Sequence, residues 1–171
     1  MQFGSVIRPR IALVGEFGSG KTHMAQYMVD NFGYTKYSFA TSLKIVARDY
    51  YGATLSVKNR SLLQQIGDAM RSVNQDVFAN KTLKQIDIFQ SNRVEPWRPV
   101  KTVVIDDLRF NNEYALLKQR EWYVVRILPR EPLQYQPERD HQSETEQINM
   151  VVDAEITSGD YESLNNILYQ E

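Results

Sequence analysis

The segment from Gly15 to Thr22 holds the residue types with the clearest chemistry in this chain. It reads Gly-Glu-Phe-Gly-Ser-Gly-Lys-Thr, which fits the pattern G-x-x-x-x-G-K-[ST]. At this spacing the glycines let backbone N–H groups converge on phosphate oxygens. Lys21 can then reach the β- and γ-phosphates, and the Thr22 hydroxyl can ligate Mg²⁺. The residues expected to hold nucleotide phosphates are Gly15, Gly18, Ser19, Gly20, Lys21 and Thr22.

The sequence on either side of this segment is of the kind that such a loop requires. The apolar run Ile11–Val14 is typical of a buried strand. The residues from Lys21 to Asn31 are expected to form a helix, whose N-terminal dipole attracts phosphate. Strand, loop and helix in this order predict a site for a nucleoside triphosphate, with ATP and Mg²⁺ as the expected ligands.

Two adjacent carboxylates, Asp106 and Asp107, form the second candidate site. They follow the apolar stretch that begins at Val100, which predicts a buried strand ending at Asp106. Metal or water ligation is one interpretation, and turn formation or helix capping is the other. No glutamate accompanies the pair, so a hydrolytic ATPase is disfavoured. The string that begins Asn80-Lys81 lacks the aspartate of a guanine-reading Asn-Lys-x-Asp motif, so a GTPase is disfavoured too.

Arginines near these motifs could neutralise the charge of a transferring phosphoryl group. One follows the two aspartates directly, one lies in a long helical stretch, and three flank or lie within the proline-rich segment 129–142. This segment is expected to act as a lid that excludes water. The candidates are Arg71, Arg109, Arg126, Arg130 and Arg139.

The choice of acceptor rests on a missing general base. His23 and His141 are the only histidines, and neither has an evident carboxylate partner in the sequence. A phosphate acceptor is already anionic and needs alignment rather than a base. A hydroxyl acceptor would profit from a carboxylate such as Asp49. The sequence therefore favours a phosphate acceptor.

Composition limits the class of protein. The chain has 171 residues, 42% of them apolar, a formal net charge of −1 and no cysteine. Disulfides and cysteine-ligated metals are excluded, and no basic balance points to nucleic acid. No apolar run approaches the length of a membrane span, and the N-terminus does not resemble a secretory signal. A cytoplasmic protein without nucleic-acid or membrane partners is expected.

The alternation of expected strands and helices predicts an α/β fold with a doubly wound, mainly parallel five-stranded sheet. One domain over residues 1–171 is expected, with a helical acceptor-side insertion near 40–99 and a lid near 129–143. The strands are expected at 10–14, 34–39, 100–106, 123–128 and 153–157, and the helices at 21–31, 41–51, from 62 through 89, at 111–120 and at 160–169, with a short capped turn after Ser143.

Several strings, in order along nearly the whole chain, resemble the bacteriophage deoxynucleoside monophosphate kinase family. The stretch 107–113, Asp-Leu-Arg-Phe-Asn-Asn-Glu, is similar to the family's Asp-Val-Arg-Phe-Pro-Asn-Glu, from which Leu108 and Asn111 depart. The other matching stretches are Ser38–Lys44, Leu62–Gly67 with Arg71, His141–Glu144 and Asp153–Leu164.

This resemblance implies a kinase that moves the γ-phosphoryl group of ATP onto a (deoxy)nucleoside 5′-monophosphate. It implies that Lys21, Asp107, Arg109 and a lid arginine, Arg130 or Arg139, act at the phosphates, with Asp106 or Asp107 at the metal. Homodimerisation is a further expectation from the same resemblance. The residues expected around the acceptor are Phe39, Lys44, Arg71, Arg109 and Arg139.

Two alternatives stay open. One is a kinase for a hydroxyl acceptor, similar to dephospho-coenzyme A kinase, which would need an essential carboxylate in the acceptor pocket. The other is an ATP-binding switch protein, which would bind nucleotide without transferring phosphate.

Overall fold

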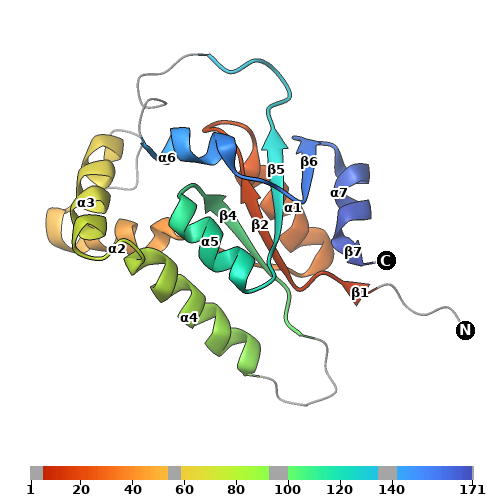
Figure 1. Cartoon of the computed structure of the whole chain (residues 1–171), viewed down its shortest axis with the longest axis horizontal. Helices are drawn as coiled ribbons and strands as arrows, with labels where there is room; N and C mark the ends of the chain where they lie inside the picture. The colour runs from red at the N-terminus through yellow and green to blue at the C-terminus, as the bar shows by residue number, and fades with distance from the viewer. Residues whose placement is uncertain (1–5, 54–58, 93–99, 135–141, 171) are drawn as a thin grey trace, which may run out of the picture.

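The computed structural model describes residues 6–53, 59–92, 100–134 and 142–170, and its centre is a five-stranded sheet. All four strand pairings in this sheet are parallel, and the spatial order is β3-β4-β2-β5-β6 (Figure 1). The predicted α/β fold with a five-stranded sheet is confirmed. The strands are β2 (Arg10–Val14), β3 (Thr35–Tyr37), β4 (Val103–Leu108), β5 (Tyr123–Leu128) and β6 (Ala154–Thr157).

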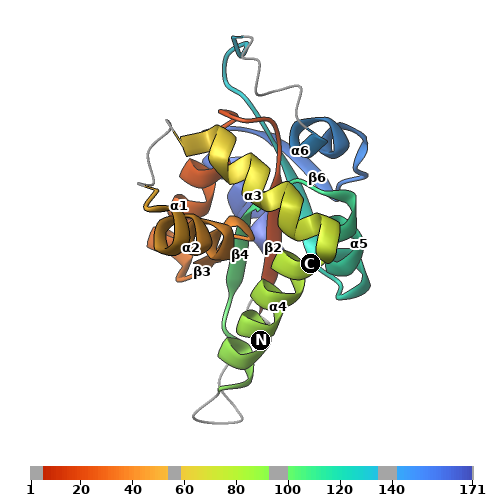
Figure 2. The same ribbon diagram turned by 90° about the vertical axis from the view of Figure 1, so that its left-hand side faces the viewer.

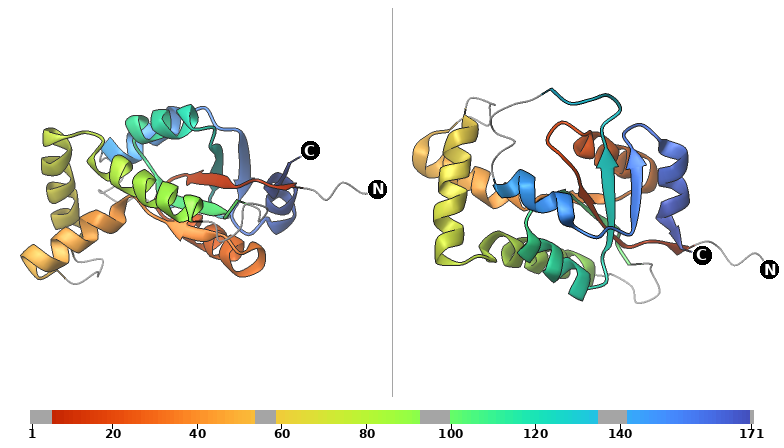
Figure 3. Two further views of the ribbon diagram at one scale, coloured as in Figure 1. Left: turned by 90° about the horizontal axis from the view of Figure 1, so that it is seen from below. Right: turned by 45° about the horizontal axis from the view of Figure 1, so that its top comes forward.

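Helices cover both faces of the sheet. The helices are α1 (Lys21–Phe32), α2 (Ala40–Tyr51), α3 (Arg60–Val73), α4 (Val77–Ser91), α5 (Asn111–Gln119), α6 (Gln142–Thr145) and α7 (Tyr161–Leu168), with a 3₁₀ helix, η3 (Glu146–Asn149). Seen from below, α4 and α5 lie on one face and α1 and α7 on the other (Figure 3). Helices α2 and α3 stand together at one side of the sheet (Figure 2).

Two hydrophobic cores follow from the alternation of side chains along each strand. Ile11 and Leu13 of β2 belong to the core under α1 and α7, while Ala12 and Val14 belong to the core under α2, α4 and α5. All four are fully buried. Because both faces of a parallel sheet are covered, its strands read as continuous apolar runs, as these do.

The order of the strands places a ligand site at the carboxyl end of β2. This strand lies between β4 and β5 in the sheet. After β2 the chain forms β3 and β4 on one side of it, and then crosses to form β5 and β6 on the other side. Ligands of open α/β sheets bind in the crevice at such a switch point. The Gly15–Thr22 segment, called the phosphate loop from here on, follows β2, and Asp106 and Asp107 lie near the end of β4, so these two candidate sites share this edge.

Two expected elements differ from those observed. The expected helical stretch from residue 62 through 89 is two helices, α3 and α4, which separate at Asn74, Gln75 and Asp76. The Asn112 side-chain amide donates to the Gln75 carbonyl at 3.0 Å and to Asp76 Oδ1 at 2.8 Å, so a contact from α5 holds the break. The expected strand from Val100 begins instead at residue 103 and runs to residue 108.

A small second sheet was not predicted. It pairs β1 (Val6–Ile7) with β7 (Tyr169–Gln170) in antiparallel fashion. The helix expected to end at Tyr169 therefore stops one residue earlier, and the two ends of the described chain meet beside α7 (Figure 1). Within the described residues, no helix is both long enough and apolar enough to cross a membrane.

Candidate functional site

The phosphate loop has a backbone shape that favours glycine at several positions, and at two of them the surroundings leave no room for a side chain. Gly15 has φ of 151° and Gly20 has φ of 97°, both outside the range that other residues commonly adopt. A β-carbon on Gly15 would lie 2.4 Å from the Ile127 carbonyl oxygen, and one on Gly20 would lie 2.1 Å from Ser158 Oγ. The loop is therefore enclosed by the ends of β5 and β6 as well as by its own turn.

Two polar side chains inside this loop fit an anionic ligand. Lys21 is only 7% exposed, and its ammonium group donates to the carbonyls of Gly15 and Glu16, the latter at 2.7 Å. Ser19 is 1% exposed, and its hydroxyl is a buried polar group without a hydrogen-bond partner among the described residues. A buried unpaired hydroxyl costs about 1–3 kcal/mol. A phosphate oxygen in the loop would supply its missing partner.

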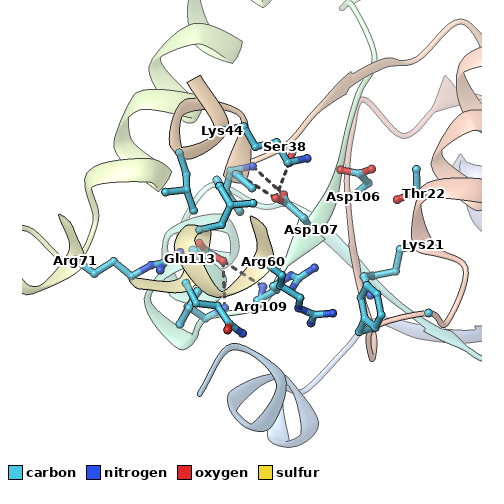
Figure 4. Close-up of a pocket in the computed structure, with 18 of the residues that line it drawn as sticks. Lys21, Thr22, Ser38, Lys44, Arg60, Arg71, Asp106, Asp107, Arg109 and Glu113 are labelled. Carbon is cyan, nitrogen blue, oxygen red and sulfur yellow. Dashed lines mark hydrogen bonds between the residues drawn. The ribbon is translucent and has the colours of Figure 1, made fainter. Parts of the chain in front are cut away.

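A cavity of about 600 Å³ opens beside the loop and joins it to the helical insertion (Figure 4). One wall comes from the phosphate loop and the start of α1, the floor from the ends of β3 and β4, and the other wall from α2, α3 and α5. The lining residues that carry the chemistry are Phe17, Lys21, Thr22, Phe39, Lys44, Arg60, Arg71, Asp106, Asp107, Arg109 and Glu113.

Asp107 binds the beginning of α2. Its carboxylate accepts hydrogen bonds from the Ser38 hydroxyl at 2.5 Å and from the backbone N–H groups of Phe39 and Ala40 at 2.8 and 2.9 Å. A carboxylate at a helix N-terminus satisfies orphan donors and complements the helix dipole. This contact fixes α2 to the end of β4, so helix capping, the structural interpretation of the aspartate pair, describes Asp107.

Asp106 points the other way, toward the phosphate loop. It is 8% exposed, faces the Thr22 side chain, and lies 3.9 Å from the Lys36 ammonium (Figure 4). Burial, followed by the charge of Asp107, raises the pKa of Asp106. Neighbouring strand residues alternate in direction, which is why adjacent aspartates serve different neighbours. Among the described residues, no three His, Cys, Asp or Glu side chains gather into a metal site.

The two aspartates predict opposite effects on stability. Asp107→Asn should destabilise the fold by about 2 kcal/mol, because an amide cannot accept hydrogen bonds at both of its terminal atoms. Asp106→Asn should leave the free energy of unfolding unchanged or raise it, because folding disfavours the charged form of this group. Urea unfolding followed by circular dichroism measures both. A larger loss for Asp106→Asn than for Asp107→Asn would contradict this assignment.

Glu113 and Arg71 lie at the far end of the cavity. Glu113 is 3% exposed, and its Oε2 accepts the backbone N–H groups of Arg109 and Phe110, each at 3.1 Å. Burial raises the pKa of Glu113 to about 8, helped by the charge of Asp107 and opposed by the two N–H groups and by Arg71. The Arg71 guanidinium lies 4.0 Å above the ring of Phe110. This end of the cavity thus combines a cation with a carboxyl group and an aromatic ring.

Most of the predicted acceptor residues lie around one space. Lys44 of α2, Arg71 of α3 and Arg109 after β4 all line the cavity. Phe39 lines it as well, but it is 2% exposed and belongs to the hydrophobic core, so it also packs the interior. Asp49 is exposed, forms an ion pair with Arg48 at 2.7 Å, and is not among the residues that line the cavity.

The arginines of the expected lid do not share one position. The guanidinium of Arg130 lies about 3.5 Å from the position of a β-carbon on Gly159, beside the turn that contacts Gly20, and is not part of the cavity lining. Arg126 donates to the Gln147 carbonyl in η3 at 3.0 Å and to the carbonyl of Met150, the residue after η3, at 2.7 Å, and it pairs with Glu155 at 3.0 Å. Arg126 is thus a structural residue. Arg139 and His141 lie outside the described residues.

Three of the lining residues that carry the chemistry, Phe17, Arg60 and Glu113, were not predicted as site residues. Arg60, the first residue of α3, places its guanidinium 3.9 Å above the ring of Phe17 in the phosphate loop. No motif marks this arginine in the sequence. Only its position just before the apolar helical pattern that starts at Leu62 would have drawn notice.

Gln147 is another residue near the phosphate loop that the sequence did not predict. It is buried in η3, and its side-chain oxygen accepts the backbone N–H of Gly15 at 3.3 Å. The segment that follows the expected lid therefore contacts the first glycine of the phosphate loop.

The sequence matches no family model. It is similar to a protein of Acanthamoeba polyphaga mimivirus named "Putative deoxynucleotide monophosphate kinase", with 28% identity over 145 residues that cover 68% of this chain and 72% of the viral protein. It is also similar to the "Uncharacterized protein ORF76" of Ictalurid herpesvirus 1, with 29% identity over 111 residues. That match covers 64% of this chain and 44% of the herpesvirus protein.

Solved structures with a similar arrangement include a shikimate kinase from Aquifex aeolicus, with a TM-score of 0.44 and 12% identity over 93% of this chain and 94% of the other. A gluconokinase from Sinorhizobium meliloti 1021 gives a TM-score of 0.42 and 13% identity over 93% of this chain and 89% of the other.

Proposed function

We propose that this protein is a phosphate-loop kinase that transfers the γ-phosphoryl group of ATP to a (deoxy)nucleoside 5′-monophosphate and forms the diphosphate. The observation that carries the proposal is the single cavity that joins the phosphate loop to the cations of the helical insertion. Two phosphorylated ligands bound at its two ends would meet between Lys21 and Arg109. Direct transfer needs such a meeting of donor and acceptor.

On the donor side, the loop residues and Lys21 would hold the β- and γ-phosphates. Thr22 and Asp106 would hold Mg²⁺, which prefers one or two protein oxygens together with substrate phosphates. Both side chains line the cavity and face each other beside Lys21, which supports the assignment (Figure 4). When bound, the metal would neutralise charge on the phosphates. Asp107 would act indirectly, by fixing α2 and thereby the position of Lys44.

On the acceptor side, Lys44, Arg71 and Arg109 would bind the phosphate and the base of the monophosphate. Five cationic side chains and three carboxyl groups line the cavity, and Glu113 is largely protonated at neutral pH because its pKa is about 8. The balance of charge therefore favours anionic ligands. Arg130 and Arg139, on the segment expected to form a lid, would approach the donor when that segment closes.

The interactions of the carboxyl groups that line the cavity favour a phosphate acceptor over a hydroxyl acceptor. Asp107 accepts three hydrogen bonds from Ser38 and the start of α2, and Asp106 faces Thr22 and lies 3.9 Å from the Lys36 ammonium. Glu113 is buried against two backbone N–H groups. None of these lining carboxylates is placed as a general base, which a hydroxyl acceptor would need and an anionic phosphate would not.

The nature of the acceptor as a nucleotide rests on the resemblance to the bacteriophage family and on the name of the mimivirus relative. A cytoplasmic enzyme of viral nucleotide metabolism would fit both, and it would use ATP and Mg²⁺.

The test measures ADP formation from Mg²⁺-ATP with a panel of ribo- and deoxynucleoside monophosphates, and with dephospho-coenzyme A as the hydroxyl acceptor. We expect turnover that depends on at least one monophosphate and is absent with the hydroxyl acceptor. Turnover with the hydroxyl acceptor alone would replace the proposal with the dephospho-coenzyme A kinase alternative. ATP binding with no transfer to any acceptor would favour the switch protein.

A further inference from the structure

We propose that Arg60 is a further catalytic residue, which binds the phosphoryl group passing between donor and acceptor, and that Phe17 is the positioning residue that directs it. This inference rests on the proposed kinase function. It assigns a role to a pair of residues between the two halves of the cavity: Phe17, at a variable position of the phosphate-loop motif, and Arg60, which no motif marks.

The contact between the two residues joins separate parts of the molecule. Phe17 lies within the phosphate loop, between Glu16 and Gly18, and so belongs to the donor side. Arg60 begins α3 in the helical insertion, which supplies the acceptor side. The guanidinium carbon lies 3.9 Å from the centre of the ring, and both side chains line the cavity.

Stacking on a ring orients a guanidinium in a particular way. The face of the guanidinium covers the face of the aromatic ring, while its N–H groups point outward in the plane of the group. These in-plane donors match the oxygens of a phosphoryl group, which arginine binds in a bidentate manner. The ring of Phe17 attracts the cation through its face and so holds the Arg60 guanidinium at the phosphate loop.

The position of Arg60 differs from those of the other cavity cations. Lys21 lies inside the phosphate loop, and Arg71 lies at the far end of the cavity against Phe110. Figure 4 shows Arg60 and Arg109 between Lys21 on one side and Glu113 on the other. In phosphoryl transfer the largest gain comes from charge placed where the group moves between donor and acceptor, and an arginine there contributes about 10³–10⁵-fold.

The experiment compares Arg60→Met, Arg60→Lys and Phe17→Leu in full-length protein, with Arg48→Met as the matched control for loss of a surface arginine. Arg48 is exposed on α2, and among the described residues its guanidinium pairs with its neighbour Asp49. The readouts are kcat and KM for both substrates, the Kd of ATP, and the Kd of a dinucleoside pentaphosphate that spans both sites.

We expect Arg60→Met to lower kcat by about 10²-fold or more. The Kd of ATP should change by less than about threefold, whereas the Kd of the dinucleoside pentaphosphate should rise by at least about tenfold. Arg60→Lys should restore little of the lost kcat, because an ammonium group cannot stack on the ring and also donate two parallel hydrogen bonds to a phosphoryl group. Phe17→Leu should lower kcat about tenfold in the wild-type background but have almost no effect in Arg60→Met, because the two residues act as a pair.

Several results would overturn the inference. A kcat within about twofold of wild type in Arg60→Met, full rescue by Arg60→Lys, or independent effects of the two substitutions would each do so. A wild-type enzyme that transfers phosphate to no monophosphate would instead refute the proposed function. The wild-type activity is therefore measured first, before any variant is compared with it.

Discussion

Replacing Lys21 with methionine is expected to lower kcat for phosphoryl transfer by about 10³-fold. The Lys21 ammonium group is buried in the concave side of the phosphate loop, where it donates to the Gly15 and Glu16 carbonyls. With nucleotide bound, we expect it to leave these carbonyls and bind the phosphates. Methionine keeps the length and most of the volume of the side chain, so the loop should keep its shape. Initial rates at saturating substrates measure the loss.

The control for this experiment is Lys84→Met, which removes an exposed lysine of α4 that lies outside the cavity lining. Its kcat should equal that of wild type within about twofold. Circular dichroism and urea unfolding should show that both variants remain folded. A Lys21→Met enzyme with more than about a tenth of wild-type kcat would contradict the role given to the phosphate loop.

Replacing Glu113 with glutamine is expected to remove a large part of the pH dependence of stability. Burial raises the pKa of Glu113 from 4.5 to about 8 in the folded protein. Between these two values the folded chain retains a proton that the unfolded chain has released. The contribution of the protonated Glu113 to the free energy of unfolding is therefore complete below about pH 4.5 and is lost as the pH rises through 8.

The expected size of this effect is on the order of 3 kcal/mol between pH 6 and pH 8, since each pH unit in the window corresponds to about 1.4 kcal/mol. Glutamine resembles the protonated acid and can still accept the two backbone N–H groups. The free energy of unfolding of Glu113→Gln should match wild type near pH 4 and exceed it by a growing margin as the pH rises toward 8. Glu162→Gln, at an exposed position of α7, is the control and should follow the wild-type curve. Parallel curves for Glu113→Gln and wild type would refute the raised pKa.

The site illustrates which features a sequence can predict. The phosphate loop was predictable because its chemistry is carried by neighbouring residues in a fixed spacing, between an apolar strand and a helix. The roles of Asp106 and Asp107 were not, because adjacent strand residues point in opposite directions. Which one faces the phosphate loop and which one meets α2 depends on where β4 lies in the sheet.

The features that were missed depend on contacts between distant parts of the chain. The apolar periodicity continues through the break between α3 and α4, and the contact that holds the break comes from Asn112, 36 residues from Asp76. Gln147 reaches Gly15 across 132 residues. Likewise, the stacking of Arg60 on Phe17 joins two segments whose proximity follows only from the fold.

The most direct test of the central claim follows the γ-phosphate of ATP itself. ATP labelled with ³²P at the γ-phosphate is incubated with Mg²⁺ and a mixture of deoxynucleoside monophosphates, in one reaction with wild-type enzyme and in another with Lys21→Met. The nucleotide products of the two reactions are then separated and compared. We predict label in a nucleoside diphosphate with wild type, and none above background with the variant. Label that stays in ATP, or appears only as free phosphate, would contradict transfer between two nucleotides in this cavity.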